Sequence, residues 1–154
     1  MAKTAKLMAV QGAAVIVAAA FLIVGVLGFI PGVTTHYDQL QWVGHHSGAH
    51  LFGVFMVSGL HNIVHMAFGA AGLAMARTYA KARAYFLIGG LAYLGLWVYG
   101  LVIDHGSSAN FVPVNNADNW LHFGLGLGMV LLGLTLAGQH DPTKRPKRRA
   151  KVRT

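Results

Sequence analysis

The stretch MAVQGAAVIVAAAFLIVGVLGFI, from Met8 to Ile30, decides the fold class of this chain. It contains no charged residue, and a Pro-Gly pair follows it. A helix needs about 20 mostly apolar residues to cross a hydrocarbon core roughly 30 Å thick. Residues 8–30 are therefore predicted to span a membrane. Lys3 and Lys6 resemble the basic start of a secretory signal, but the apolar run is too long for one, so we expect the span to be retained.

Three further apolar segments follow, at about residues 51–76, 84–103 and 119–137. The 154 residues are 55% hydrophobic and 10% charged, whereas soluble domains are about one quarter charged. We therefore predict an all-α fold, an integral membrane four-helix bundle over residues 1–140, followed by a basic tail at 141–154.

Positive charge is confined to one side of these spans. Arg77, Lys81 and Arg83 fill the link between the second and third spans, and the other basic residues precede the first span or follow the fourth. Cytoplasmic loops carry an excess of Lys and Arg, so both termini are predicted to be cytoplasmic. The tail is expected to fix this orientation, and its contact with anionic lipid, worth about 1 kcal/mol per residue, is the alternative. Its basic residues include Lys144, Arg145, Lys147, Arg148 and Arg149.

The second and fourth spans share a short pattern. Residues 61–65 read His-Asn-Ile-Val-His, and residues 118–122 read Asp-Asn-Trp-Leu-His. Residues 21–25 and 86–90 match more loosely, with Phe-Leu-Ile at the start of each. Such a repeat predicts two tandem helical hairpins related by an axis along the membrane normal.

Histidines in this repeat are candidate metal ligands. His61 and His65 lie one helical turn apart, a spacing that lets two imidazoles bind one ion. His122 on the partner helix, with Asp118 one turn before it, can complete the set. Such ligands suit Zn²⁺, Cu²⁺ or Fe, and the same imidazoles can instead be axial ligands of haem.

Two other roles for these polar residues stay open. Asn62 and Asn119, together with the histidines, can hydrogen-bond between helices, at about 0.6 kcal/mol each. Alternatively, the histidines can relay protons, since imidazole titrates near neutral pH.

The start of the second helix decides how many histidines share one face. If the helix is continuous from near His46, then His46, His50, His61 and His65 form one stripe. If it begins near Val57, His61 moves to the outer edge of the bilayer. The sequence leaves this choice open.

The glycines predict close helix packing, because small residues let backbones approach in lipid. Gly124 and Gly128 form a Gly-x-x-x-Gly motif. We expect it to serve packing within the bundle, with a homodimer as the alternative.

Four blocks of this sequence also resemble a known family. They are residues 28–32 (GFIPG), 44–49 (GHHSGA), 60–65 (LHNIVH) and 117–122 (ADNWLH). Together they resemble domain-of-unknown-function family 4383, small four-span bacterial membrane proteins. The resemblance implies a bacterial plasma membrane location and brings no established activity, ligand or catalytic residue.

The absence of cysteine and glutamate narrows the chemistry available to the chain. Thiolate metal sites, Cys nucleophiles and paired-glutamate hydrolases are excluded. We therefore expect a non-enzymatic structural or accessory subunit of a membrane complex, with the lipid bilayer, a membrane-protein partner or a second copy as partners and no nucleic acid. A metal- or haem-binding protein is the alternative, and a small channel or transporter is a weaker one.

Overall fold

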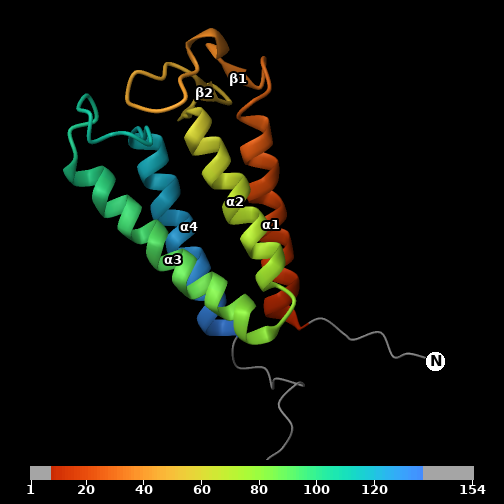
Figure 1. The fold of residues 1–154 in the computed structure, drawn as a ribbon. Helices are drawn as coiled ribbons and strands as arrows, with labels where there is room; N and C mark the ends of the chain where they lie inside the picture. The colour runs from red at the N-terminus through yellow and green to blue at the C-terminus, as the bar shows by residue number, and fades with distance from the viewer. Residues whose placement is uncertain (1–7, 137–154) are drawn as a thin grey trace, which may run out of the picture.

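Four helices carry the fold (Figure 1). The computed structural model describes residues 8–136. Consecutive helices run in opposite directions, so α1 and α3 end where α2 and α4 begin, beneath a layer of loops and short strands that we call the cap. The predicted all-α class with four helices is confirmed. The basic tail lies outside the described residues. The helices are α1 (Ala9–Leu27), α2 (Gly59–Met75), α3 (Tyr79–Val102) and α4 (Asn116–Thr135).

Polar side chains fix where the last three helices begin. The Ser58 hydroxyl accepts a hydrogen bond from the backbone N–H of His61, at 3.1 Å, and Thr78 caps α3 in the same way. Asn115 caps α4 and accepts from the backbone N–H of Asp118, at 3.0 Å. Such caps satisfy amide groups that have no partner within the helix. Each helix therefore begins directly after its capping residue.

The cap contains a small antiparallel sheet in the order β1-β2-β3, formed by strands of two residues each. The tight turn between β2 and β3 places Phe52 and Gly53 at φ values of 54° and 72°, a left-handed conformation in which a helix cannot continue. Residues 51–58 are therefore not helical, and the second span is shorter at its start than expected. The cap elements are β1 (Thr34–Thr35), a 3₁₀ turn η1 (Tyr37–Gln39), β2 (His50–Leu51) and β3 (Phe55–Met56).

The histidine stripe expected from a helix beginning near His46 is therefore wrong. His46 lies in a cap loop and His50 in β2, whereas α2 begins at Gly59. Only His61 and His65 share the helix.

The helices pack most extensively as two hairpins, α1 with α2 and α3 with α4. In each hairpin, glycines let the two backbones approach closely. A Cβ atom added to Gly69 would lie 2.7 Å from the Ala18 carbonyl oxygen, and one added to Gly126 would lie 2.9 Å from the Gly90 carbonyl oxygen. In lipid, such contacts hold helices together by van der Waals packing.

The Gly-x-x-x-Gly motif of α4 does not take part in this packing. An added Cβ would meet nothing within 4 Å at either Gly124 or Gly128, although Gly126 between them is buried. The expected packing of the motif within the bundle is therefore wrong. These two glycines lie on an outward face of α4.

One packing contact recurs in both hairpins. Asn62 lies against Gly28, directly after α1, and Asn119 lies against Gly100 of α3 in the same way. Phe21 and Tyr93, each seven residues before one of these glycines, stack on each other with ring centroids 5.5 Å apart. The tandem-hairpin prediction therefore agrees with the packing.

The loose match between residues 21–25 and 86–90 is out of register by two helical turns. The structural partner of Phe21 is Tyr93, which follows Phe86 by seven residues. Residues seven apart lie on nearly the same face of a helix. An apolar pattern can therefore match at two registers that differ by seven residues.

The outer surface of the helices is apolar and the interior contains polar groups. Ile16, Ile88 and Leu131 are 71%, 67% and 50% exposed, whereas Asn62 and Asn119 are 1% and 3% exposed. Among the described residues, two helices, α1 and α3, are long and apolar enough to cross a membrane. Apolar side chains such as Phe86 are also buried, so the unusual features are the large apolar side chains exposed outside and the polar side chains buried among apolar ones.

Candidate functional site

Two stacked imidazoles occupy the first turns of α2, below the cap. The rings of His61 and His65 have centroids 4.6 Å apart and an angle of 11° between their planes. His61 Nδ1 lies 3.2 Å from the carbonyl oxygen of Pro113, and His65 Nδ1 lies 3.1 Å from that of His61. The stack is therefore held by the helix itself and by the segment before α4.

These partners determine which ring nitrogen carries the hydrogen. A carbonyl oxygen only accepts, so Nδ1 of each neutral ring must be the donor. Nε2 of His61 and of His65 is then an unprotonated acceptor. Fixing a tautomer through the second nitrogen is also how proteins orient histidines that bind ligands.

The third histidine of the predicted set approaches from the other hairpin. His122 of α4 is 5% exposed, and its ring lies 5.3 Å from that of Tyr93. Its Nδ1 atom is buried and has no hydrogen-bond partner among the described residues. A buried polar nitrogen without a partner costs about 1–3 kcal/mol. Such a group is a reason to look for a ligand or a water at this place.

Asp118 joins α4 to the cap. Its carboxylate accepts hydrogen bonds from the backbone N–H groups of Met56 and Asn115, at 3.1 and 2.9 Å. The Asn115 side chain in turn donates to the Val54 carbonyl oxygen, at 2.8 Å. Asp118 is 2% exposed, so these contacts fix the β2–β3 turn above the histidines.

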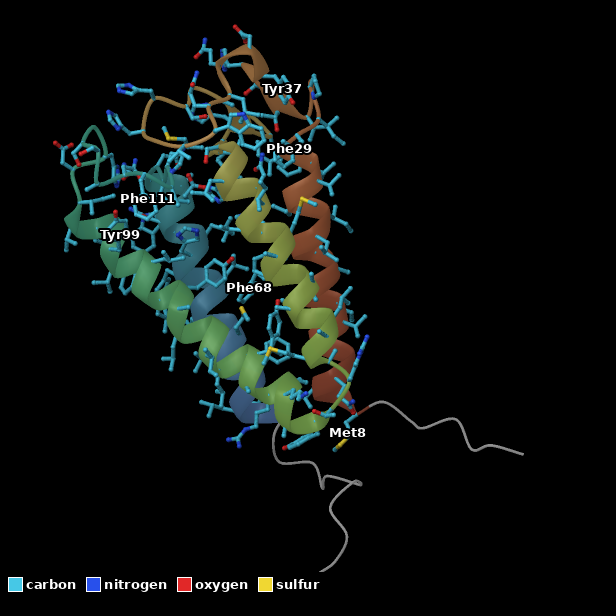
Figure 2. The ribbon with its side chains drawn as sticks, viewed as in Figure 1. Met8, Phe29, Tyr37, Phe68, Tyr99 and Phe111 are labelled. Atoms are coloured by element: carbon cyan, nitrogen blue, oxygen red, sulfur yellow. The ribbon has the colours of Figure 1, made fainter. Side chains whose placement is uncertain are left out.

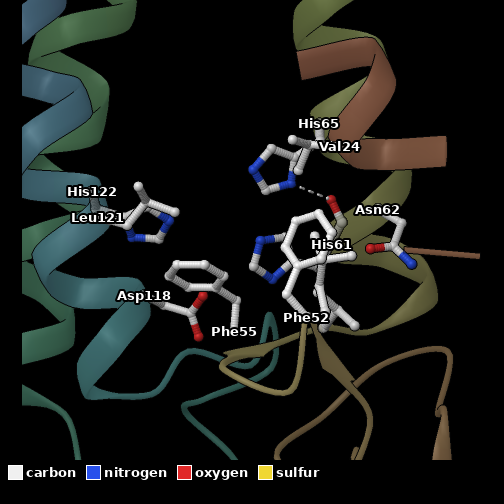
Figure 3. A pocket seen from close by; sticks show the side chains of 11 residues that line it. Val24, Phe52, Phe55, His61, Asn62, His65, Asp118, Leu121 and His122 are labelled. Atoms are coloured by element: carbon white, nitrogen blue, oxygen red, sulfur yellow. Dashed lines mark hydrogen bonds between the residues drawn. The ribbon is translucent and has the colours of Figure 1, made fainter. Parts of the chain in front are cut away.

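All four predicted ligands line one cavity of about 70 Å³ (Figure 3). His61 and His65 lie on one side of it, and His122 and Asp118 face them from the other. Its remaining walls come from α1, the cap and further side chains of α2 and α4. A buried water needs roughly 10–15 Å³, so the cavity has room for a few. The other lining residues include Val24, Leu51, Phe52, Phe55 and Leu121.

A second cavity, of about 140 Å³, lies on the α3 side of the same histidines. His61, His65 and His122 line both cavities and thus separate them. Apart from these imidazoles and two tyrosines, its walls are apolar. They include Val64, Leu96, Phe111, Val112 and Val114.

The four residues share a cavity without forming a ligand cluster. Within residues 8–136, no three side chains of the kinds that ligate metals are grouped so that they could hold one ion. Because the rings of His61 and His65 are nearly parallel and stacked, their Nε2 lone pairs lie in two separate, nearly parallel planes and do not meet at one point. A chelated ion would require the rings to turn.

The two predicted helix–helix asparagines lie at the contacts within the hairpins. Asn119 donates to the Gly100 carbonyl oxygen through Nδ2, at 2.8 Å. Asn62 lies beside Gly28, but its Nδ2 atom has no partner among the described residues. The two halves of the repeat are thus alike in packing and different in hydrogen bonding.

Sequence reasoning missed the aromatic cluster on the side of the histidines away from the cap. Phe21 stacks on His65 at 5.6 Å, and Phe68 contacts both Phe21 and Tyr93, at 4.8 and 5.4 Å. Figure 2 shows Phe68 in the interior of the bundle. The signal was present in the sequence, because Phe21 and Tyr93 precede the paired glycines by the same seven residues.

The fold and this site define a class of protein: a bundle of two repeated helical hairpins, with two membrane-length helices and a histidine-lined interior beneath a cap. The chain belongs to the family described as Domain of unknown function (DUF4383), which matches residues 11–135. No curated protein and no solved structure matches the chain.

Proposed function

We propose that this chain is a four-span integral protein of the bacterial plasma membrane, with a non-enzymatic structural or accessory role in a membrane complex. The observation that carries the proposal is that large apolar side chains are exposed outside the bundle while polar side chains are buried within it. Ile16, Ile88 and Leu131 are exposed on three different helices, while Asn62 and Asn119 are buried. Lipid accepts such a surface, and buried polar groups then join helices rather than face hydrocarbon.

The charge distribution supports cytoplasmic termini. Arg77, Lys81 and Arg83 lie at the end of the bundle where α1 begins and α4 ends. The cap segments, residues 28–58 and 103–115, contain no Lys or Arg. By the positive-inside rule, the cap faces the outside.

Single-cysteine labelling tests this topology without background, because the chain has no native cysteine. Ser108 in the cap and Ala80 at the start of α3 are both exposed. We expect a membrane-impermeant maleimide to label Ser108→Cys in intact cells, and to label Ala80→Cys only after permeabilisation. The opposite pattern would reverse the orientation, and equal labelling of both would refute a spanning bundle.

The accessory role is supported by the outward Gly-x-x-x-Gly face of α4. Gly124 and Gly128 have open space beside them, and such a face receives a neighbouring helix closely. We expect a Gly124→Leu/Gly128→Leu variant to lose a cross-linked complex that wild-type protein forms in native membranes. Gly12→Leu, at an equally open glycine of α1, is the matched control. A complex whose mass is twice that of the chain identifies a homodimer, and retention of the complex in the double variant would contradict the role.

A second candidate is metal binding, favoured by the fixed acceptor nitrogens of His61 and His65. Metal content measured by mass spectrometry on gently purified protein tests it. Near-stoichiometric zinc, copper or iron that is lost in a His61→Ala/His65→Ala variant would support this candidate. Haem is less well supported, because the cavities of about 70 and 140 Å³ are smaller than the roughly 300–1,000 Å³ of ordinary small-molecule pockets.

A channel is the weakest candidate. The aromatic rings of Phe21, Phe68 and Tyr93 pack against one another. They lie between the histidines and the end of the bundle where α2 is joined to α3. A hydrated path along the axis would have to displace them. Flux measurements in liposomes, with His65→Ala as the variant, test this candidate.

A further inference from the structure

The cavity on the α3 side of the histidines has the size of one aromatic ring. Its volume is about 140 Å³. An apolar cavity of roughly 150 Å³ in another protein binds benzene. We propose that this cavity binds the ring of a membrane-soluble phenol or hydroquinone, whose hydroxyl donates a hydrogen bond to Nε2 of His61 or His65.

The walls of the cavity suit an apolar ring. Leu96 from α3, Val64 from α2 and Val114 from the segment before α4 surround it. Ligand sites are mostly apolar and carry a few well-placed polar groups that fix the orientation of the ligand. Here the imidazoles supply those groups.

The hydrogen-bond chemistry selects a donor. The Nδ1 atoms of His61 and His65 are engaged with the carbonyl oxygens of Pro113 and His61, so each Nε2 offers a lone pair. Both rings are nearly buried, at 5% and 9% exposure. A ligand hydroxyl satisfies the Nε2 acceptor, whereas a ligand ring without a donor group leaves Nε2 unpaired.

Entry is open on the apolar surface of the bundle. Val64, Leu96 and Phe111 line the cavity and are 47%, 43% and 55% exposed. A ligand therefore reaches the imidazoles past side chains that face lipid. This route rests on the proposed membrane location, whereas the ring-binding site itself does not.

Two isosteric probes test the site in the full-length chain in nanodiscs. The probes are 4-fluorophenol and 4-fluorotoluene, followed by ¹⁹F NMR, with empty nanodiscs measured in parallel. We expect both to bind, with 4-fluorophenol roughly 3- to 10-fold tighter, the usual net worth of one hydrogen bond. No saturable binding, or equal binding of the two probes, would overturn the proposal.

Asparagine variants keep the donor and withdraw the acceptor toward the backbone. In His61→Asn/His65→Asn, each amide NH₂ takes the place of an Nδ1–H, and the remaining acceptor, Oδ1, lies closer to the backbone than Nε2 does in histidine. We expect the preference for 4-fluorophenol to disappear while 4-fluorotoluene still binds. His36→Asn is the matched control, because His36 lies in the cap at a φ of 49°, which asparagine tolerates.

A blocking variant keeps the test decisive if the asparagine variant does not fold. Leu96→Trp adds bulk at the partly exposed mouth of the cavity and should abolish binding of both probes. Unchanged binding in Leu96→Trp would place the probes elsewhere and refute the site. Because nanodisc binding does not depend on topology in cells, its failure is distinguishable from failure of the cysteine-labelling test.

Discussion

Replacing Gly90 by alanine is expected to push α3 away from α4. The added Cβ would lie 2.9 Å from the Gly126 carbonyl oxygen and 2.9 Å from the Val130 backbone nitrogen. Both distances fall 0.5 Å short of the 3.4 Å at which ordinary contact begins. Since both atoms belong to the backbone of α4, a side-chain rotation cannot relieve the clash.

The cost follows from two opposing effects. Overpacking of this kind costs about 1–3 kcal/mol, whereas alanine in a helix gains about 0.5–1 kcal/mol over glycine. Gly95, on the same helix, has open space where a Cβ would lie. Gly95→Ala should therefore show the gain in helix propensity without any packing cost. The difference in unfolding free energy between the two variants therefore isolates the packing cost, about 1–3 kcal/mol.

Reversible unfolding of both variants in mixed micelles, titrated with denaturing detergent, measures this difference. Gly90→Ala should unfold at lower detergent fraction than wild type, and Gly95→Ala at an equal or higher fraction. Equal stability of Gly90→Ala and Gly95→Ala would refute the close approach of the two backbones.

Three further predictions concern the polar and aromatic interior. Asn119→Ala should lower the unfolding free energy by about 0.5–1.5 kcal/mol, the net contribution of one hydrogen bond, because the Gly100 carbonyl loses the Asn119 donor but keeps His105 Nε2, and the same detergent titration measures it; Asn62→Ala should cost less, because Asn62 Nδ2 has no partner among the described residues. Asp118→Ala should release the cap, seen as faster hydrogen exchange at the Met56 amide with unchanged exchange in α3; equal exchange rates would contradict the tether. Phe68→Ala should cost less than the about 3–5 kcal/mol of a fully buried Phe→Ala change, because the Phe68 ring is half-buried, and a loss below about 1 kcal/mol would mean that the aromatic cluster does not join the hairpins.

The four helices were predictable because long apolar runs and the residues that interrupt them are local signals. The start of α2 was not predictable from the sequence, because it depends on the Ser58 cap and on the left-handed turn at Gly53. A run of apolar residues continues across both positions and hides them. Pattern alone placed His61, His65, His122 and Asp118 in one region, and they line one cavity.

What the pattern could not supply was the direction of each side chain. The parallel stacking of His61 and His65 depends on the Pro113 carbonyl, which lies 52 residues away along the chain. The outward position of Gly124 depends on the rotation of α4 about its own axis. The Gly-x-x-x-Gly motif is the same whether it faces the bundle or faces outward, so the sequence does not reveal this rotation. Long-range contacts of this kind have no local sequence signature.

In the proposed membrane bundle, the exposed apolar faces of the four helices lie in lipid. Electron paramagnetic resonance of single spin labels in liposomes tests it most directly. Labels at Ile88→Cys and Leu131→Cys should be relaxed strongly by oxygen and weakly by a water-soluble nickel complex, whereas a label at Ser108→Cys in the cap should show the reverse. Strong nickel relaxation at Ile88 and Leu131 would place these faces in water and contradict the membrane bundle.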